Sequence, residues 1–239
     1  MNERTWKLQK KYFGHEVHPY RVLEGRVESQ LRPDATVLDA GCGRGAPVLL
    51  KYADKARRLV GIDLVDFTCT DPRLELHKTD LAHTPLAPSS VDVVYSRSVV
   101  EHLADPTAVF AEMRRILRPG GHFIFLTANL WDYASIAARL IPNRFHPAIV
   151  ARVEGRAEED TFPIQYKANT RRAVQRHARA AGLEVERFEY LGQYPNYFMF
   201  SAPLFLLGTA YQKTIQRFRP LHFLQGWILV TLRKPVGDA

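Results

Sequence analysis

A strand that runs directly into three glycines at alternate positions constrains the fold of this chain more than any other stretch. Residues 36–40 suit a buried strand, because β-branched and aliphatic side chains dominate them. A glycine-rich turn after a strand lets the backbone approach a ligand that a Cβ would block. We expect a helix over about 46–55, with its free N–H groups pointing at the same spot. The glycines of this turn are Gly41, Gly43 and Gly45.

Strands and helices alternate after this turn, which predicts an α/β fold with a parallel, doubly wound sheet. We expect helices over 1–31, with a break near Gly14 and Pro19, and over 106–118, 129–141 and 171–181. Asp105 has the side chain of an N-cap for the second of these helices, and Pro106 suits its first position. The expected strands cover residues 36–40, 58–63, 74–78, 91–96, 122–127, 183–190 and 228–232.

Charge and cysteine content narrow the class of protein. Among 239 residues, 33 Lys and Arg exceed 25 Asp and Glu, so the net charge is +8. This excess favours an anionic partner, although a basic surface alone also explains it. The two cysteines, Cys42 and Cys69, form neither a disulfide framework nor a metal-ligand spacing. The first residues lack the apolar core of a signal peptide, so we expect a cytoplasmic protein.

Acidic residues follow several expected strands and identify the type of ligand. The right-handed crossovers of a doubly wound sheet bring Asp39, Asp63 and Asp80 to one carboxyl edge. Asp63 lies where a carboxylate can accept hydrogen bonds from both hydroxyls of a ribose. The glycine spacing departs from the Gly-x-Gly-x-x-Gly of dinucleotide-binding enzymes, and only Arg44 offers positive charge for a pyrophosphate. These features indicate a nucleoside with a modest tail.

At these residues the chain resembles the class I S-adenosylmethionine-dependent methyltransferases over about 33–127. The resemblance rests on residues 39–45, 61–64, 80–81, 91–94, 99–103 and 117–121. It implies a Rossmann-like seven-stranded sheet of order 3-2-1-4-5-7-6, with strand 7 antiparallel and helical cap insertions. It also implies that S-adenosylmethionine is the cofactor. The residues implied to bind it are Asp39, Ala40, Gly41, Cys42, Gly43, Gly45, Asp63, Leu64, Asp80, Leu81, Ser96 and Arg97.

The reaction that the resemblance implies is in-line transfer of a methyl group from a sulfonium to a nucleophile. A hydroxyl acceptor must also lose a proton, and histidine suits that role near neutral pH. His102 follows strand four, where it either acts as the base or packs against the cofactor. No metal is expected, because Ser98 replaces the first glutamate of a Glu-x-x-Glu-His pattern that binds metal in some relatives. The candidate catalytic residues are His102, His146, His15 and Tyr166.

The cap segments decide the acceptor. We expect one methyltransferase domain over 1–239, with a helical lid at 1–31 and caps at 129–166 and 194–224. Both caps mix aromatic and aliphatic residues with arginines, which favours a small lipophilic or aromatic acceptor, anionic or carrier-tethered. Oxygen is expected ahead of carbon or nitrogen as the atom methylated. Segment 194–224 could instead form a homodimer or peripheral membrane contact.

Two other functions remain open. The positive net charge suits an RNA or protein methyltransferase, although the sequence shows no recognisable RNA-binding appendage and gives no firm sign of a nucleic acid partner. A non-catalytic S-adenosylmethionine-binding subunit would more often carry a degraded glycine motif, and residues 39–45 are intact.

Overall fold

The structure is a computed structural model that describes residues 3–140 and 162–237. These residues form two compact units. The unit that we call the sheet unit comprises 20–127, 163–189 and 229–237. The unit that we call the helical unit comprises 3–19, 128–140, 162 and 190–228. The single-domain organisation expected from the sequence stays a prediction.

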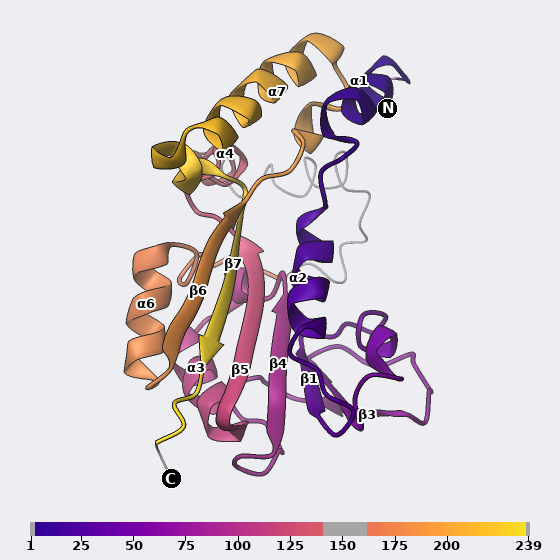
Figure 1. The fold of residues 1–239 in the computed structure, drawn as a ribbon, viewed down its shortest axis with the longest axis vertical. Helices are drawn as coiled ribbons and strands as arrows, with labels where there is room; N and C mark the ends of the chain where they lie inside the picture. Colours follow the sequence, from indigo (N-terminus) through magenta and orange to yellow (C-terminus); the bar gives the residue numbers. More distant parts are fainter. Residues whose placement is uncertain (1–2, 141–161, 238–239) are drawn as a thin grey trace. The chain divides into compact units, whose positions relative to one another are not determined.

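Seven strands form one sheet of order β3-β2-β1-β4-β5-β7-β6 (Figure 1). β1 pairs in parallel with β2 and β4, β2 with β3, and β4 with β5. β7 runs antiparallel to β5, because Gly120 N donates to Lys234 O while Lys234 N donates to Gly121 O. The predicted strand order is therefore confirmed. The strands are β1 Thr36–Ala40, β2 Arg58–Asp63, β3 Leu74–Lys78, β4 Val91–Arg97, β5 Leu117–Ala128, β6 Glu184–Leu191 and β7 Trp227–Arg233.

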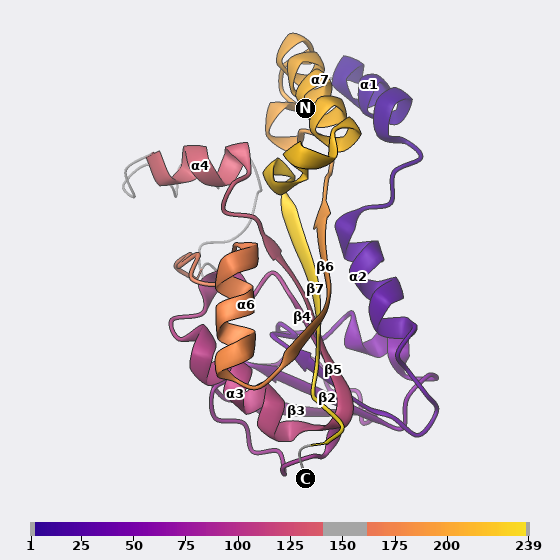
Figure 2. The same ribbon diagram turned by 60° about the vertical axis from the view of Figure 1, so that its left-hand side comes forward.

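Helices cover both faces of this sheet, as a doubly wound fold requires. Figure 2 shows α3 (Pro106–Ile116) and α6 (Arg171–Ala180) on one face and α2 (Pro19–Glu28) on the other. Asp105 caps α3 as predicted, since its Oδ1 accepts from the amides of Thr107 at 2.9 Å and Ala108 at 3.1 Å. Phe110 of α3 packs edge-on against Phe123 of β5, with ring centroids 5.5 Å apart.

The helix predicted over 46–55 is wrong. The chain there forms only the short 3₁₀ helix η1 (Leu49–Tyr52). Ala46 adopts a left-handed backbone with φ 43°, which an α-helix does not allow at its start. Ala46 and Leu49 are fully buried, so packing beneath the sheet edge decides the conformation of this segment. The glycine turn consequently receives no helix N-terminus from the residues that follow it.

The helical unit contains α1 (Glu3–Phe13), α4 (Tyr133–Leu140), η5 (Asn196–Phe198), α7 (Ala202–Arg217) and η6 (Arg219–Leu224). α1 lies beside α7 in both ribbon views (Figures 1 and 2). Phe13 of α1 meets Phe205 of α7 edge-on at 6.2 Å, and Met199 joins the same small core. The predicted break between α1 and α2 is confirmed. No helix in the described part of the chain is long and apolar enough to span a bilayer.

Candidate functional site

A cavity of about 370 Å³ opens at the carboxyl ends of β1 and β4. Its volume falls in the range of about 300–1,000 Å³ that is typical of small-molecule sites. The glycine turn after β1 forms one wall, and the end of β4 contributes the other. The cavity therefore lies where the strand order predicted a ligand. Its lining residues are Asp39, Gly41, Cys42, Gly43, Arg44, Gly45, Pro47, Val48, Tyr95 and Arg97.

Two glycines of the turn are needed for different reasons. Gly41 has φ +95°, and a Cβ there would lie 2.2 Å from Cγ2 of Val99. Gly43 has φ +70°, but no atom lies within 4 Å of the position that its Cβ would take. Gly41 is therefore required by packing, whereas Gly43 keeps open space in front of the backbone. Because η1 replaces the expected helix, any backbone donors to a ligand come from the turn itself.

Asp39 and Arg97 bring opposite charges to the cavity. Asp39 is almost fully buried, and Tyr95 Oη donates a 2.6 Å hydrogen bond to its Oδ2. Burial raises the pKa of Asp39 to about 7, although Tyr95 and Arg97 act in the opposite direction. The Arg97 guanidinium lies 4.7 Å from the ring centroid of Tyr20, which comes from α2. A zwitterion is the kind of group that this pair of charges suits.

Asp63 ends β2 and ties the glycine turn to the neighbouring loop. Its Oδ2 accepts from Gly43 N at 2.7 Å, and its Oδ1 accepts from Leu64 N at 2.7 Å. Its backbone carbonyl accepts from Thr79 N at 3.0 Å. Asp63 does not itself line the cavity but holds Gly43, which does. The predicted ribose-binding acid is therefore bonded directly to the predicted glycine cradle.

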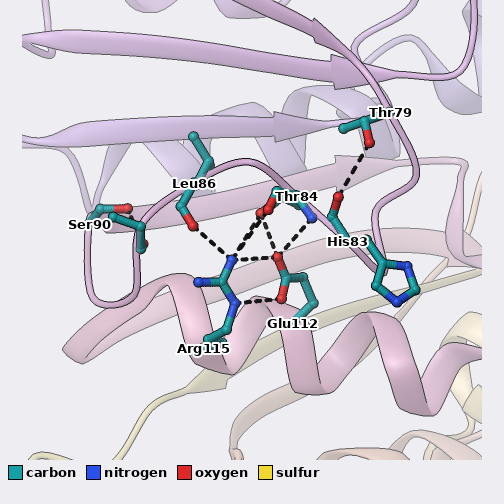
Figure 3. Close-up of polar contacts among 8 residues, drawn as sticks. Thr79, His83, Thr84, Leu86, Ser90, Glu112 and Arg115 are labelled. Carbon is teal, nitrogen blue, oxygen red and sulfur yellow. Dashed lines mark hydrogen bonds and ion pairs between the residues drawn. The ribbon is translucent and has the colours of Figure 1, made fainter.

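The loop that carries Asp80 and Leu81 is fastened to α3 (Figure 3). Glu112 Oε1 accepts from both Thr84 N at 2.9 Å and Thr84 Oγ1 at 2.6 Å. Arg115 donates to Glu112 Oε2 at 2.7 Å and to the carbonyl of Leu86 at 2.7 Å. Burial acts to raise the pKa of Glu112, but these hydrogen bonds outweigh it and hold that pKa below its usual value. The loop is thus fixed just after the residues predicted to contact adenine.

His102 and Tyr166 are brought to one backbone segment. His102 belongs to η2 (Val100–His102), and its Nδ1 lies 3.2 Å from the carbonyl oxygen of Pro163. The carbonyl of Glu101 accepts from Tyr166 N at 3.1 Å, and Tyr166 has a left-handed φ of 52°. A backbone carbonyl only accepts, so Nδ1 carries the proton of a neutral His102 ring and Nε2 carries its lone pair. These two predicted catalytic residues are neighbours.

The other predicted site residues are scattered. Ser96, the penultimate residue of β4, has a buried hydroxyl with no hydrogen-bond partner among the described residues. Leu81 is buried, whereas Leu64 and Asp80 are exposed. Ala40 is a core residue of β1, which leaves only its backbone for a ligand.

Two of the predicted catalytic histidines are not placed with His102. His15 is an exposed residue of the helical unit, between α1 and α2. His146 lies outside the described residues. Within the described ranges, no group of three or more His, Cys, Asp or Glu side chains is arranged to hold a metal ion.

Sequence reasoning missed Tyr95 and Glu112 as parts of this region. Tyr95 lies two residues before Arg97 in β4, so the alternation of a strand places both side chains on the same face. That spacing could have identified it. Glu112 lies on α3 and reaches a loop 28 residues away, for which the sequence offers no signal.

Residues 38–125 match the family model described as a methyltransferase domain. A "probable S-adenosylmethionine-dependent methyltransferase" of Mycolicibacterium smegmatis is 43% identical over 98 residues, which are 39% of this chain and 38% of that protein. The ubiquinone biosynthesis O-methyltransferase of Aliivibrio fischeri is 28% identical over 140 residues, which are 54% of this chain and 59% of that protein. The matches thus span less than two thirds of these curated relatives.

Solved structures share the fold over nearly the whole chain. Geranyl diphosphate methyltransferase in complex with S-adenosylmethionine has a TM-score of 0.55 and 17% identity, covering 89% of this chain and 84% of that one. The [4+2]-cyclase SpnF has a TM-score of 0.56 and 18% identity, covering 90% and 81%. The fold alone therefore does not decide the reaction. The match over residues 38–125 shows a methyltransferase domain in this part of the chain, and the sheet order agrees with the fold of the solved structures.

Proposed function

We propose that the chain binds S-adenosylmethionine at the glycine-turn cavity and transfers its methyl group to a small acceptor, releasing S-adenosylhomocysteine. The observation that carries this proposal is the cavity itself. Its walls combine the open backbone at Gly43 with the opposite charges of Asp39 and Arg97. The relatives named as S-adenosylmethionine-dependent methyltransferases support the same activity.

The described residues fit this cofactor part by part. Asp39 and Arg97 suit the ammonium and carboxylate of its amino acid end, because both line one cavity. Asp63 suits a ribose hydroxyl, since Oδ2 of its carboxylate accepts from Gly43 N alone and keeps acceptor capacity, whereas Oδ1 already accepts from the amides of Leu64 and Val65. Asp80 and Leu81 suit the adenine, whose exocyclic amine is a donor for a carboxylate.

Bound S-adenosylmethionine supplies an electrophilic methyl group on a positively charged sulfur. The residues of this chain orient the donor through its two ends, which favours an in-line approach of the acceptor. Positive charge disappears from sulfur in the transfer, so a buried site with few water molecules suits the reaction. A hydroxyl acceptor also needs a base. The Nε2 lone pair of neutral His102 gives this chain one candidate for that role.

The acceptor we propose is a small lipophilic or aromatic molecule that is methylated on oxygen. The similarity to a ubiquinone biosynthesis O-methyltransferase supports oxygen as the nucleophile. The geranyl diphosphate methyltransferases share only the fold, so carbon remains the second choice. Apolar side chains of the helical unit, such as Phe198 and Tyr211 beside Tyr133, suit a lipophilic partner.

Calorimetry with the full chain tests cofactor binding first. S-adenosylmethionine and S-adenosylhomocysteine should both bind, and an absence of heat at millimolar ligand would refute the cofactor site. Methyl-tritiated S-adenosylmethionine then tests transfer to a panel of catechols, phenols, carboxylic acids and amines, with bulk RNA and protein as further acceptors. Label in the organic phase supports the proposal.

The same assay separates the alternatives. Label confined to RNA or protein would favour a macromolecular methyltransferase. Cofactor binding without transfer to any acceptor would favour a non-catalytic binding subunit. His102→Gln should lower the turnover of a hydroxyl acceptor while leaving the dissociation constant of S-adenosylhomocysteine unchanged. An unchanged turnover would remove His102 from catalysis.

A further inference from the structure

Residues 200–223 of the helical unit carry six large apolar side chains that are exposed. A monomeric protein rarely presents many of them together, so such a patch marks a contact surface. Leu207 is 70% exposed and Phe200 is 67% exposed. The whole group consists of Phe200, Leu204, Leu206, Leu207, Phe218 and Phe223.

The two faces of α7 differ sharply. Its inward face carries the buried residues Phe205, Gly208, Thr209, Gln212 and Ile215, which recur every three or four positions as on one face of a helix. The opposite face carries the exposed Leu206 and Leu207 and continues through residues 210, 214 and 217. We call this exposed face, from residue 203 to 217, the outer stripe of α7. It is apolar at its N-terminal end and basic at its C-terminal end.

The apolar part of the outer stripe has no side-chain hydroxyl that depends on water for a hydrogen-bond partner. Its one hydroxyl belongs to Thr214, whose Oγ1 donates to the carbonyl of Ala210 at 2.8 Å. A hydroxyl bonded back to its own helix presents mainly its methyl group to the outside. Residues 203, 206, 207, 210 and 214 therefore give an apolar stripe about 17 Å long, at about 1.5 Å per residue, with Lys213 beside it.

The Lys and Arg side chains of the segment that carries the stripe have no acidic side chain within that segment. Residues 190–228 contain three basic side chains and no Asp or Glu. Lys213 already contacts the N-terminal segment. Its Nζ lies 4.5 Å from the ring centroid of Phe13 in α1 and 2.6 Å from Oε1 of Glu16, which follows α1. Arg217 and Arg219 are exposed and flank Phe218, itself 54% exposed. The apolar stripe therefore ends in two arginines around an aromatic ring.

We propose that the outer stripe of α7 docks onto the surface of an anionic phospholipid membrane. Leu206 and Leu207 would enter the acyl boundary, while Arg217 and Arg219 would reach the phosphates. Residues 190–228 carry no acidic side chain, so they suit phosphates better than a second copy of this chain. A two-fold contact between two copies would bring four of these arginines together, and this segment offers no carboxylate to neutralise them. This proposal is independent of methyl transfer.

Sedimentation of the full chain with vesicles tests the proposal. Vesicles of phosphatidylcholine alone should leave the protein in solution, and vesicles with added phosphatidylglycerol should carry it down. High salt should weaken that binding. Arg217→Gln combined with Arg219→Gln should reduce the partition coefficient about thirtyfold, at about 1 kcal/mol for each arginine. Leu206→Glu combined with Leu207→Glu should abolish it.

Val236→Glu is the control, because Val236 is 65% exposed, close to the 70% of Leu207, but belongs to the sheet unit. Circular dichroism melts should show that each variant folds. Equal binding by the Leu206→Glu, Leu207→Glu variant and the control would overturn the proposal. The proposal would also be overturned if the wild type did not bind anionic vesicles but formed a dimer in light scattering, and if the Leu206→Glu, Leu207→Glu variant were a monomer. That result would identify the stripe as a self-contact.

Discussion

Tyr95 donates a 2.6 Å hydrogen bond from β4 to Asp39 at the end of the neighbouring β1. The two residues are register partners across the parallel pair, so the contact follows from the sheet itself. It buries a carboxyl group at the wall of the cavity, and burial raises the pKa of Asp39 to about 7. The same burial, with Asp39 nearby, raises the pKa of Tyr95 well above its usual value. Tyr95 therefore remains a donor while Asp39 titrates.

Asp39 should make the stability of the ligand-free protein depend on pH. Folding raises its pKa from 3.8 to about 7, so its contribution to the free energy of unfolding is present below about pH 4. That contribution is lost as pH rises through about 7, by at most about 1.4 kcal/mol per pH unit. Asp39→Asn should flatten this decline. Urea unfolding across the range measures it, with the exposed Asp34→Asn as control, and parallel curves for Asp39→Asn and wild type would contradict the assignment.

The affinity for S-adenosylmethionine should depend on pH in the opposite direction to the stability. An ionised Asp39 attracts an ammonium, so the affinity should rise as pH increases through about 7. Tyr95→Phe should weaken the affinity, because the carboxylate loses its donor. Calorimetry at several pH values checks both effects. An affinity that stays constant through this range would place the ammonium elsewhere.

Asp63→Asn should weaken binding of S-adenosylhomocysteine by about tenfold or more, since a charge-assisted hydrogen bond contributes about 1.5–3 kcal/mol. The amide group would also place an N–H against at least one of the three backbone N–H groups that now donate to the Asp63 carboxylate. Asp66→Asn serves as the control, because Asp66 is exposed and its carboxylate pairs with Lys78, while its contact with Arg44 is through the backbone carbonyl, which the substitution keeps. Calorimetric dissociation constants decide between them. Equal constants for the two variants would remove Asp63 from the ribose site.

Gly41→Ala should lower the melting temperature markedly, because the added Cβ meets Cγ2 of Val99 at 2.2 Å and the backbone is left-handed. Val99→Ala in the same chain should recover part of the loss, since it removes the obstructing methyl groups. Gly43→Ala meets no protein atom and should affect cofactor affinity more than stability. Thermal denaturation and calorimetry together test this contrast. If Val99→Ala does not raise the melting temperature of the Gly41→Ala variant, the loss of stability comes from the left-handed backbone alone and not from the clash with Val99.

Glu112→Gln should loosen the loop that carries Asp80 and Leu81. The variant removes the charge that accepts from Thr84 and Arg115, at about 1.5–3 kcal/mol for such contacts. Because the pKa of Glu112 is lowered in the fold, this stability is present above the usual carboxyl range and is lost as pH falls. Hydrogen exchange at the Thr84 amide should quicken, whereas the exposed Glu186→Gln should leave it unchanged. Equal protection of the Thr84 amide in the Glu112→Gln and Glu186→Gln variants would argue that Glu112 does not hold this loop against α3.

The strands and their order could be predicted because their signals are local. Residues 58–63 and 91–96 are short apolar runs, and the resemblance supplied the topology. The helix over 46–55 was predicted wrongly because its residues allow a helix, whereas the left-handed Ala46 and the burial of Leu49 prevent one. Only tertiary packing contains that information.

The candidate site divides in the same way. The glycines and Asp63 belong to two short motifs, each at the end of an expected strand, so the sequence revealed them. The partnership of Tyr95 with Asp39 depends on cross-strand register. The reach of Glu112 to Thr84 depends on how α3 lies against a loop. Neither contact corresponds to a fixed spacing of residues along the chain, so the sequence alone does not predict it.

The carboxylate of Asp63 is already held by the amides of Gly43, Leu64 and Val65 without any ligand. Its orientation was therefore fixed when the protein folded. A nucleoside that arrives there finds a preorganised acceptor and loses little further conformational entropy at this end. A substitution that leaves the carboxylate in place but frees its rotation should therefore weaken binding of the nucleoside without removing any group that contacts it.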